Sequence, residues 1–264
     1  MGSTAANGVQ AVKVSEINVD PERFQFKQDM NKDTGVSTSS QITSKKWNPL
    51  YAGLLYLWQN KDGKLFVVNG HHRLDLAKRL GVEEINAQID REVDGVTAEQ
   101  AYIKGALINI KNGNGTVYDY ANFFRKSKMS RQDALDDGFI AKGKTLAGIR
   151  ANEQLKRSMT GWLIAQGSED LWSWYVNQDE NAENKITDEM FATIVEKANG
   201  VDSIELYAIN AINRGAVKNM AEIAEYTEQH INYVNRFRSA EFTIKNNLDA
   251  VSHGTCAMAM DVNA

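Results

Sequence analysis

Two apolar runs on either side of an Asp-Gly turn constrain the fold of this 264-residue chain more than any other feature. The runs are Leu54–Trp58 and Leu65–Val68, and the six residues between them include Asp62-Gly63. This pattern predicts a β-hairpin, because the turn needs residues that tolerate a positive φ. We therefore expect a β-sheet that includes this hairpin.

A helix and a further strand are predicted directly after the hairpin. Apolar residues recur at helical spacing from His72 to Leu80, and Gly81 stands where a helix C-cap is expected. The alternation in Ile85–Ile89 predicts a strand. The stretch 69–73, Asn-Gly-His-His-Arg, consequently falls at a junction between a strand and a helix.

The prolines divide the chain into parts of different expected structure. Pro21 and Pro49 lie in the first fifth of the sequence, and no proline follows them. A short strand is expected near Val12–Ile17, and the stretch 31–44, rich in Ser, Thr, Asn and Asp, is expected to be a mobile loop. The proline-free remainder favours helices.

The predicted fold class is α+β, with a small mixed β-sheet domain that carries helices, followed by a mainly α-helical domain. Residues 1–10 are expected to form a flexible leader, residues 11–95 the sheet domain and residues 96–264 the helical domain. A capping-box pattern at Thr97–Gln100 opens the helical part. Further helices are expected near 116–127, 130–137, 144–157, 159–177, 187–198, 201–212 and 218–248.

Composition and cysteine use indicate an ordinary protein of the cytoplasm. Hydrophobic residues make up 42% of the chain and charged residues 24%, which suffices for packed cores. The single cysteine, Cys256, has no intramolecular partner, so a reducing compartment is the simplest expectation. No apolar run approaches the length of a membrane span, and the N-terminus lacks a signal-peptide profile, so no membrane partner is expected.

The stretch 69–73 holds the residues expected to bind a ligand. At the start of a helix the first N–H groups lack intrahelical acceptors and the helix dipole is positive. Asn69-Gly70 lets the backbone approach a ligand closely, while His71, His72 and Arg73 add donors. Because arginine can bind phosphate with two parallel hydrogen bonds, the stretch favours a phosphate-bearing ligand.

Simpler interpretations of the same residues remain open. Gly70 is also compatible with a turn that has no ligand, and Arg73 with an ion pair to Asp75 or Glu83. Adjacent histidines sometimes belong to a metal site, but their side chains point in different directions, and Asp75 is alone at helical ligand spacing from His71. We therefore assign no metal ligands.

The same block resembles a known family. Residues 65–81, preceded by the stretch 47–63, resemble the ParB/sulfiredoxin superfamily, in which a strand ends in a Gly-x-x-Arg turn that opens a helix. Asp20-Pro21 with the stretch 25–27 is similar to the family's first box, although Phe-Lys replaces its usual Pro-Arg. Trp47 and the stretch 112–116, Asn-Gly-Asn-Gly-Thr, are most similar to ParB-like domains of phage and mobile-element proteins, which would place the protein in a host-cell cytoplasm.

This resemblance implies a nucleotide ligand, CTP or ATP, accompanied by Mg²⁺. It implies nucleotide-binding roles for Gln25, Lys27, Asn48, Asn69, Gly70, His71, His72 and Arg73. If the site is catalytic, His71, His72 and Arg73 are the candidates, because superfamily members include nucleotide hydrolases, phosphotransferases and nucleases. Sulfinic-acid repair is excluded, since the stretch 69–73 contains no cysteine.

A basic island suggests a DNA partner. Nine Lys or Arg against four acidic residues between Ala121 and Ser158 give this stretch a net charge of +5, which leaves −9 for the rest of the chain. Within it, residues 130–157 are compatible with a helix-turn-helix whose second helix runs from Lys144 to Leu155. Asn152 and Gln154 would then be available to base edges. The DNA-binding candidates are Lys142, Lys144, Arg150, Lys156 and Arg157.

Three functions compete at this point. The first is a ParB-like, nucleotide-binding protein associated with DNA. The second is a phosphotransferase, kinase or nucleotide hydrolase that uses the Gly-His-His-Arg pocket. The third is a non-catalytic interaction scaffold. The sequence leaves the nucleotide, its turnover and the assembly open, and a homodimer is one alternative for the assembly.

Overall fold

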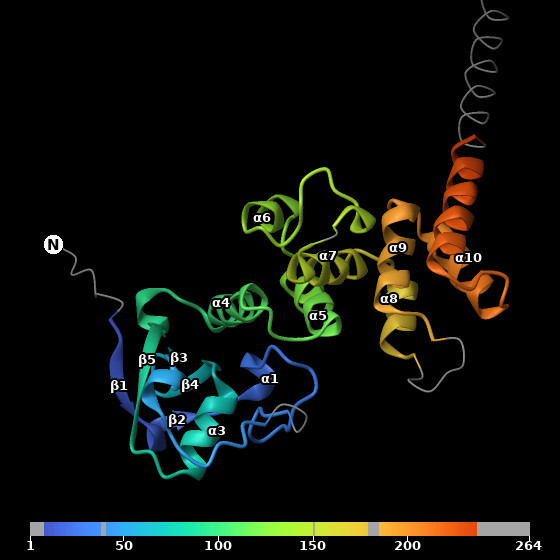
Figure 1. Cartoon of the computed structure of the whole chain (residues 1–264). Helices are drawn as coiled ribbons and strands as arrows, with labels where there is room; N and C mark the ends of the chain where they lie inside the picture. The colour runs from blue at the N-terminus through green and yellow to red at the C-terminus, as the bar shows by residue number, and fades with distance from the viewer. Residues whose placement is uncertain (1–7, 38–40, 150, 179–184, 237–264) are drawn as a thin grey trace, which may run out of the picture. The chain divides into compact units, whose positions relative to one another are not determined.

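The computed structural model describes residues 8–37, 41–149, 151–178 and 185–236. The chain forms two compact units, residues 1–162 and residues 163–264 (Figure 1). The first unit holds the sheet and the second is helical. The combination is an α+β fold, as the sequence predicts.

The first unit is built on a mixed five-stranded sheet with the strand order β1-β5-β3-β4-β2. The predicted hairpin forms the antiparallel pair β3 and β4, while β5 is parallel to β3 and antiparallel to β1, and β2 is parallel to β4. Their bounds are β1 Gln10–Lys13, β2 Ile17–Asn18, β3 Leu55–Gln59, β4 Leu65–Asn69 and β5 Glu84–Arg91.

Alternation along β3 gives the sheet two apolar faces. Leu55 and Leu57 share one core with α3, His71–Arg79, which contributes Leu74 and Ala77. Tyr56 and Trp58 share the other core with residues of two helices. These helices are α1, Pro21–Phe24, and α4, Ala98–Lys111. The sheet is therefore covered on both sides, with α3 opposite α4 (Figure 1).

Helix α3 begins and ends close to where the sequence predicts. Gly81 follows the last helical turn with a φ of 66°, and the N–H groups of Gly81 and Val82 donate to the carbonyls of Lys78 and Ala77. This pair of bonds is a Schellman motif, which satisfies carbonyls at the helix end.

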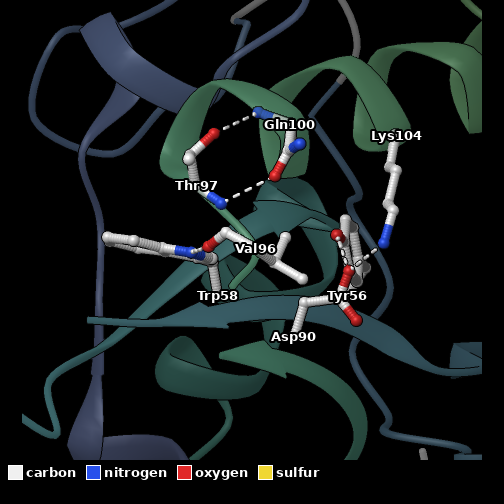
Figure 2. Close-up of polar contacts among 7 residues, drawn as sticks. All are labelled: Tyr56, Trp58, Asp90, Val96, Thr97, Gln100 and Lys104. Carbon is white, nitrogen blue, oxygen red and sulfur yellow. Dashed lines mark hydrogen bonds and ion pairs between the residues drawn. The ribbon is translucent and has the colours of Figure 1, made fainter. Parts of the chain in front are cut away.

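Polar contacts attach α4 to the sheet (Figure 2). The Trp58 indole N–H donates to the Val96 carbonyl over 2.8 Å, just before the capping box of Thr97 and Gln100. Further along, the buried Asp90 carboxylate accepts hydrogen bonds from the Tyr56 hydroxyl, 2.7 Å, and the Lys104 ammonium, 2.6 Å. Burial alone would raise the pKa of Asp90, but the bonds from Lys104 and Tyr56 outweigh it and hold this pKa below its usual value.

Two further helices belong to the first unit, and a third crosses the division between the units. They are α5 Val117–Ser127, α6 Arg131–Asp136 and α7 Glu153–Ala165, which spans the division between the units. Rings of Phe123, Phe124 and Trp162 lie in their core.

The predicted second helix of the helix-turn-helix, Lys144 to Leu155, is wrong. Residues 146–148 form a 3-10 turn, and α7 begins only at Glu153. The Asn152 side chain accepts a hydrogen bond from the Leu155 N–H, which makes it an N-cap and sets this later start. Arg150 lies outside the described residues.

The second unit contains α8 Glu169–Val176, α9 Asp188–Ala198 and α10 Asp202–Asn213, and residues 220–236 are also helical. The predictions near 187–198 and 201–212 are confirmed, whereas the single helix expected over 159–177 is interrupted. Ser168 starts a new helix by accepting from the Leu171 N–H. Residues 237–248 of the last predicted helix, together with His253 and Cys256, lie outside the described residues. None of the described helices has the length and apolarity to cross a bilayer.

A substitution at Gly105 tests how closely α4 packs against the sheet. A Cβ at this position would lie 2.6 Å from Cγ1 of Val68 and 3.3 Å from the Val68 carbonyl oxygen. We expect Gly105→Ala to lower the free energy of unfolding by about 1 to 3 kcal/mol in urea denaturation, despite the higher helix propensity of alanine. Gly148→Ala is the matched control, since its Cβ would meet nothing nearer than 3.5 Å. Equal midpoints for the two variants would contradict this packing.

Candidate functional site

A cavity of about 540 Å³ opens where β4 ends and α3 begins. Its walls come from the start of β3, the middle of β5, the second half of α4 and the loop before α5. All but one of the predicted nucleotide-binding residues line it, namely Gln25, Lys27, Asn69, Gly70, His71, His72 and Arg73. The structure thus brings together segments that are far apart in the sequence.

Gly70 makes the sharp change from strand to helix. Its φ of 107° is a conformation that residues with a Cβ rarely adopt, and it is the N-cap of α3. A Cβ here would also collide with the Leu55 side chain and lie 2.9 Å from a guanidinium nitrogen of Arg73. The first N–H groups of α3 therefore start directly at the cavity wall, where they favour negative charge.

Arg73 is held by neutral acceptors. Its Nη1 donates to the carbonyls of Ala52 and Leu54, each over 2.8 Å, and its Nη2 donates to the Asn69 side chain over 3.0 Å. The predicted alternative of an ion pair with Asp75 or Glu83 is wrong, since Asp75 pairs with Arg79 over 2.9 Å and Arg73 forms no ion pair among the described residues. Burial lowers the pKa of Arg73, because a charge removed from water is less stable.

His71 is a buried polar side chain with an unused atom. Only 4% of the residue is exposed, and its Nε2 has no hydrogen-bond partner. Gly35 lies over the ring so closely that a Cβ there would come within 2.6 Å of Cδ2. The Gln25 side chain holds this cover by donating to the Gly35 carbonyl. Burial, with a smaller effect of His72, lowers the pKa of His71 to about 3, so the ring is neutral at pH 7.

The cavity wall carries positive charge and amides but no acid. Lys27 and Arg73 supply two cations, and none of the described residues that line the cavity is an aspartate or a glutamate. The wall also includes amide side chains that the sequence analysis did not assign to the site: Gln88, Asn109, Asn112 and Asn114. Asn112 and Asn114 belong to the stretch that carries the family resemblance, so this stretch was the available signal; Gln88 and Asn109 gave none.

Other predicted residues lie elsewhere or have local partners. Asn48 does not line the cavity and instead caps α2, Pro49–Ala52, by accepting from the Leu50 N–H. Arg157 donates to the carbonyls of Gly113 and Gly115, and Gln154 to those of two residues at the end of α4. Of the DNA-binding candidates, Lys142 and Lys144 are exposed and Lys156 is partly buried.

Comparisons with known proteins were made for the sequence and the structure. No family model and no curated protein sequence match the chain. Among solved structures, the chain is similar to the C-terminally truncated chromosome-partitioning protein ParB from Caulobacter crescentus complexed with CTP-gamma-S, at 11% sequence identity and a TM-score of 0.26. The match covers 76% of this chain and 98% of that one. A similarity of this size carries no conclusion about fold or ligand.

The buried His71 predicts a pH dependence of stability. Because its pKa falls from about 6.5 in the unfolded chain to about 3 in the folded one, the unfolded state binds more protons between these values. The contribution of the neutral, buried His71 ring to the free energy of unfolding is therefore fully present above pH 6.5 and is lost as the pH falls towards 3. Urea denaturation from pH 7.5 to 4.5 should show a slope that is smaller in His71→Gln, by up to about 1.4 kcal/mol per pH unit. Parallel curves for the two proteins would contradict the burial of this ring.

Proposed function

We propose that the first unit binds a nucleotide, CTP or ATP, with its phosphate groups at the start of α3. The observation that carries this proposal is the partly buried cation of Arg73, which has only neutral partners among the described residues and lines a cavity to which those residues contribute no acidic side chain. Buried charges in proteins are as a rule paired with an opposite charge. An anionic ligand would supply the missing charge.

The surroundings of Arg73 add to the same attraction. The N-terminus of α3 and the Lys27 side chain both favour negative charge, and these contributions sum over several phosphate oxygens. His71 offers a neutral ring whose buried Nε2 is unused, so it suits a hydrogen bond to the ligand rather than an ion pair.

The size and the amides of the cavity suit the nucleoside part of such a ligand. A volume of about 540 Å³ falls within the range of small-molecule sites. Amide side chains both donate and accept, as recognition of a base edge or a ribose requires. Because Mg²⁺ is often bound mainly through substrate phosphates, we propose that the ion arrives with the nucleotide.

We propose binding rather than turnover. The usual general bases are carboxylates and histidines. Among the described residues no carboxylate lines the cavity, and His71 has a pKa of about 3, so His72 is the remaining histidine of the wall that catalysis would have to use. The sequence resemblance to ParB/sulfiredoxin-like domains supports a nucleotide ligand, and an origin in a phage or mobile element stays a prediction of that resemblance.

Lys27 provides the direct test of this function. Isothermal titration of the full chain with CTP, ATP and inorganic triphosphate, each with Mg²⁺, should show binding for at least one nucleotide. Lys27→Gln should weaken it about tenfold or more, as expected for losing a charged hydrogen bond. Lys32→Gln, an exposed lysine outside the cavity lining, is the matched control and should bind as the wild type does. Absence of binding to all three ligands would overturn the proposal and favour the scaffold interpretation.

The enzymatic alternative has its own readout in the same samples. A phosphotransferase or hydrolase would release or transfer radiolabelled phosphate, and His71→Ala or His72→Ala would abolish this activity. If phosphate is released and the release depends on these residues, the function is catalysis and not binding alone.

A DNA partner stays a separate proposal, which rests on Lys142 and Lys144. Both are exposed and lie between α6 and α7 in the basic island. If they contact phosphates, the salt dependence of duplex binding, measured by fluorescence anisotropy, should decrease in slope by about 1 to 2 in the double Ala variant. The exposed pair Lys61 and Lys64, in the β3–β4 turn, serves as control. An unchanged slope would remove these lysines from the interface.

A further inference from the structure

Asp119 is a buried carboxylate that lies outside the cavity wall. It stands in the first turn of α5, only 4% of the residue is exposed, and it does not line the cavity. Its Oδ2 accepts from the Thr116 N–H over 2.8 Å and from the Thr116 hydroxyl over 2.9 Å. These bonds belong to the capping box of α5. The cap thus uses one oxygen of the carboxylate and leaves the other available.

The second oxygen of Asp119 binds a segment that lies 91 residues away in the sequence. Its Oδ1 accepts from the backbone N–H of Gln28 over 2.8 Å. Gln28 directly follows Lys27, which supplies one of the two cations of the cavity wall. A helix cap does not require this bond. The bond instead fixes the backbone next to the lysine.

Other contacts also restrict the backbone of Lys27. Its N–H donates to the Gln25 side-chain oxygen over 3.1 Å. The preceding residue, Phe26, is buried, and its ring lies 5.9 Å from that of Tyr120 and 6.3 Å from that of Phe123, both in α5. Helix α5 therefore holds the chain on both sides of the lysine, by ring packing before it and by the carboxylate after it.

We propose that Asp119 is a positioning residue of the nucleotide site, which fixes the Gln28 backbone and so holds the Lys27 ammonium within reach of the ligand's phosphate groups. The inference rests on the proposed function and names a residue on which that function depends. A lysine carries its charge on a long, flexible stem, so the position of its backbone decides what the ammonium can reach. Through Thr116, the same carboxylate also ties this segment to the loop 112–115, which supplies two amides of the wall.

Asp119→Asn tests the proposal on the full chain. Asparagine has one side-chain oxygen, which cannot accept from Thr116 and Gln28 at once, and keeping both bonds of the cap turns the amide NH2 towards the Gln28 N–H. Isothermal titration with CTP or ATP, whichever binds, should show binding weakened about three- to tenfold. The loss should be smaller than in Lys27→Gln, because the ammonium is displaced and not removed.

Asp133→Asn is the matched control for the loss of a cap. Asp133 stands at the same position in the first turn of α6, where it accepts from the Ser130 hydroxyl over 2.6 Å, but it is exposed and does not line the cavity. This variant should bind the nucleotide as the wild type does. A loss equal to that in Asp119→Asn would assign the effect to helix capping and overturn the positioning role.

A double-mutant cycle separates positioning of Lys27 from general loosening of the site. If Asp119 acts through the lysine, Asp119→Asn should weaken binding by less than about twofold in the Lys27→Gln background. An equal loss in both backgrounds would show that the carboxylate acts independently of the lysine, and would overturn the proposal.

Asp119→Glu provides a second variant in case Asp119→Asn does not fold. Glutamate is common at this position of a capping box, so the charge and the cap are retained while the longer side chain moves the other oxygen away from the Gln28 N–H. Weakened binding is again expected. Wild-type affinity in either folded variant overturns the positioning role and leaves nucleotide binding in place, whereas absence of binding in the wild type overturns both.

Discussion

The bonds of the Arg73 guanidinium are the interaction on which the candidate site depends. They connect both ends of the hairpin, because Asn69 is the last residue of β4 while Ala52 and Leu54 come just before β3. Asn69 in turn donates to the Gly105 carbonyl, which extends the chain of bonds to α4. Hairpin, α3 and α4 are thus fixed around one cation whose charge no described side chain cancels.

A second buried charge in the same sheet shows the contrast. Asp90 is as well buried as a core residue, but the Lys104 ammonium and the Tyr56 hydroxyl compensate its charge and attach α4 to β3 and β5 (Figure 2). A buried charge is stable inside a fold when it is paired with an opposite charge and hydrogen-bonded, as Asp90 is. Among the described residues Arg73 has no such counter-charge, and it lines the cavity at the start of α3, whereas Asp90 does not line that cavity. The difference separates a charge that is compensated within the fold from one that is not.

The sequence predicted the parts of the site that depend on local signals. Asp62-Gly63 between apolar runs located the hairpin, and Gly70 and Gly81 marked the limits of α3, because turns and caps demand particular backbone conformations of single residues. The opposite wall could not be found in this way. Gln88 and Asn109 face the cavity only because β5 and α4 pack where they do, and no periodicity distinguishes such a position from an ordinary surface amide.

The errors have the same origin. A helix-turn-helix over residues 130–157 required one helix from Lys144 to Leu155, but Asn152 caps a later start and Gln154 bonds to the end of α4. The partners of Arg73 were also hidden, since backbone carbonyls leave no trace in a sequence. The sequence therefore offered only charged residues nearby, Asp75 and Glu83, as partners for Arg73.

Gly35 shows how a segment without regular structure can still be restricted at one point. It sits in a polar stretch in which most substitutions would meet only solvent, yet its missing side chain is the space that the His71 ring occupies. A side chain at this position would displace the His71 ring in the cavity wall. Changes in the length and composition of this stretch therefore leave the cavity wall as it is only while a residue without a side chain remains above the imidazole.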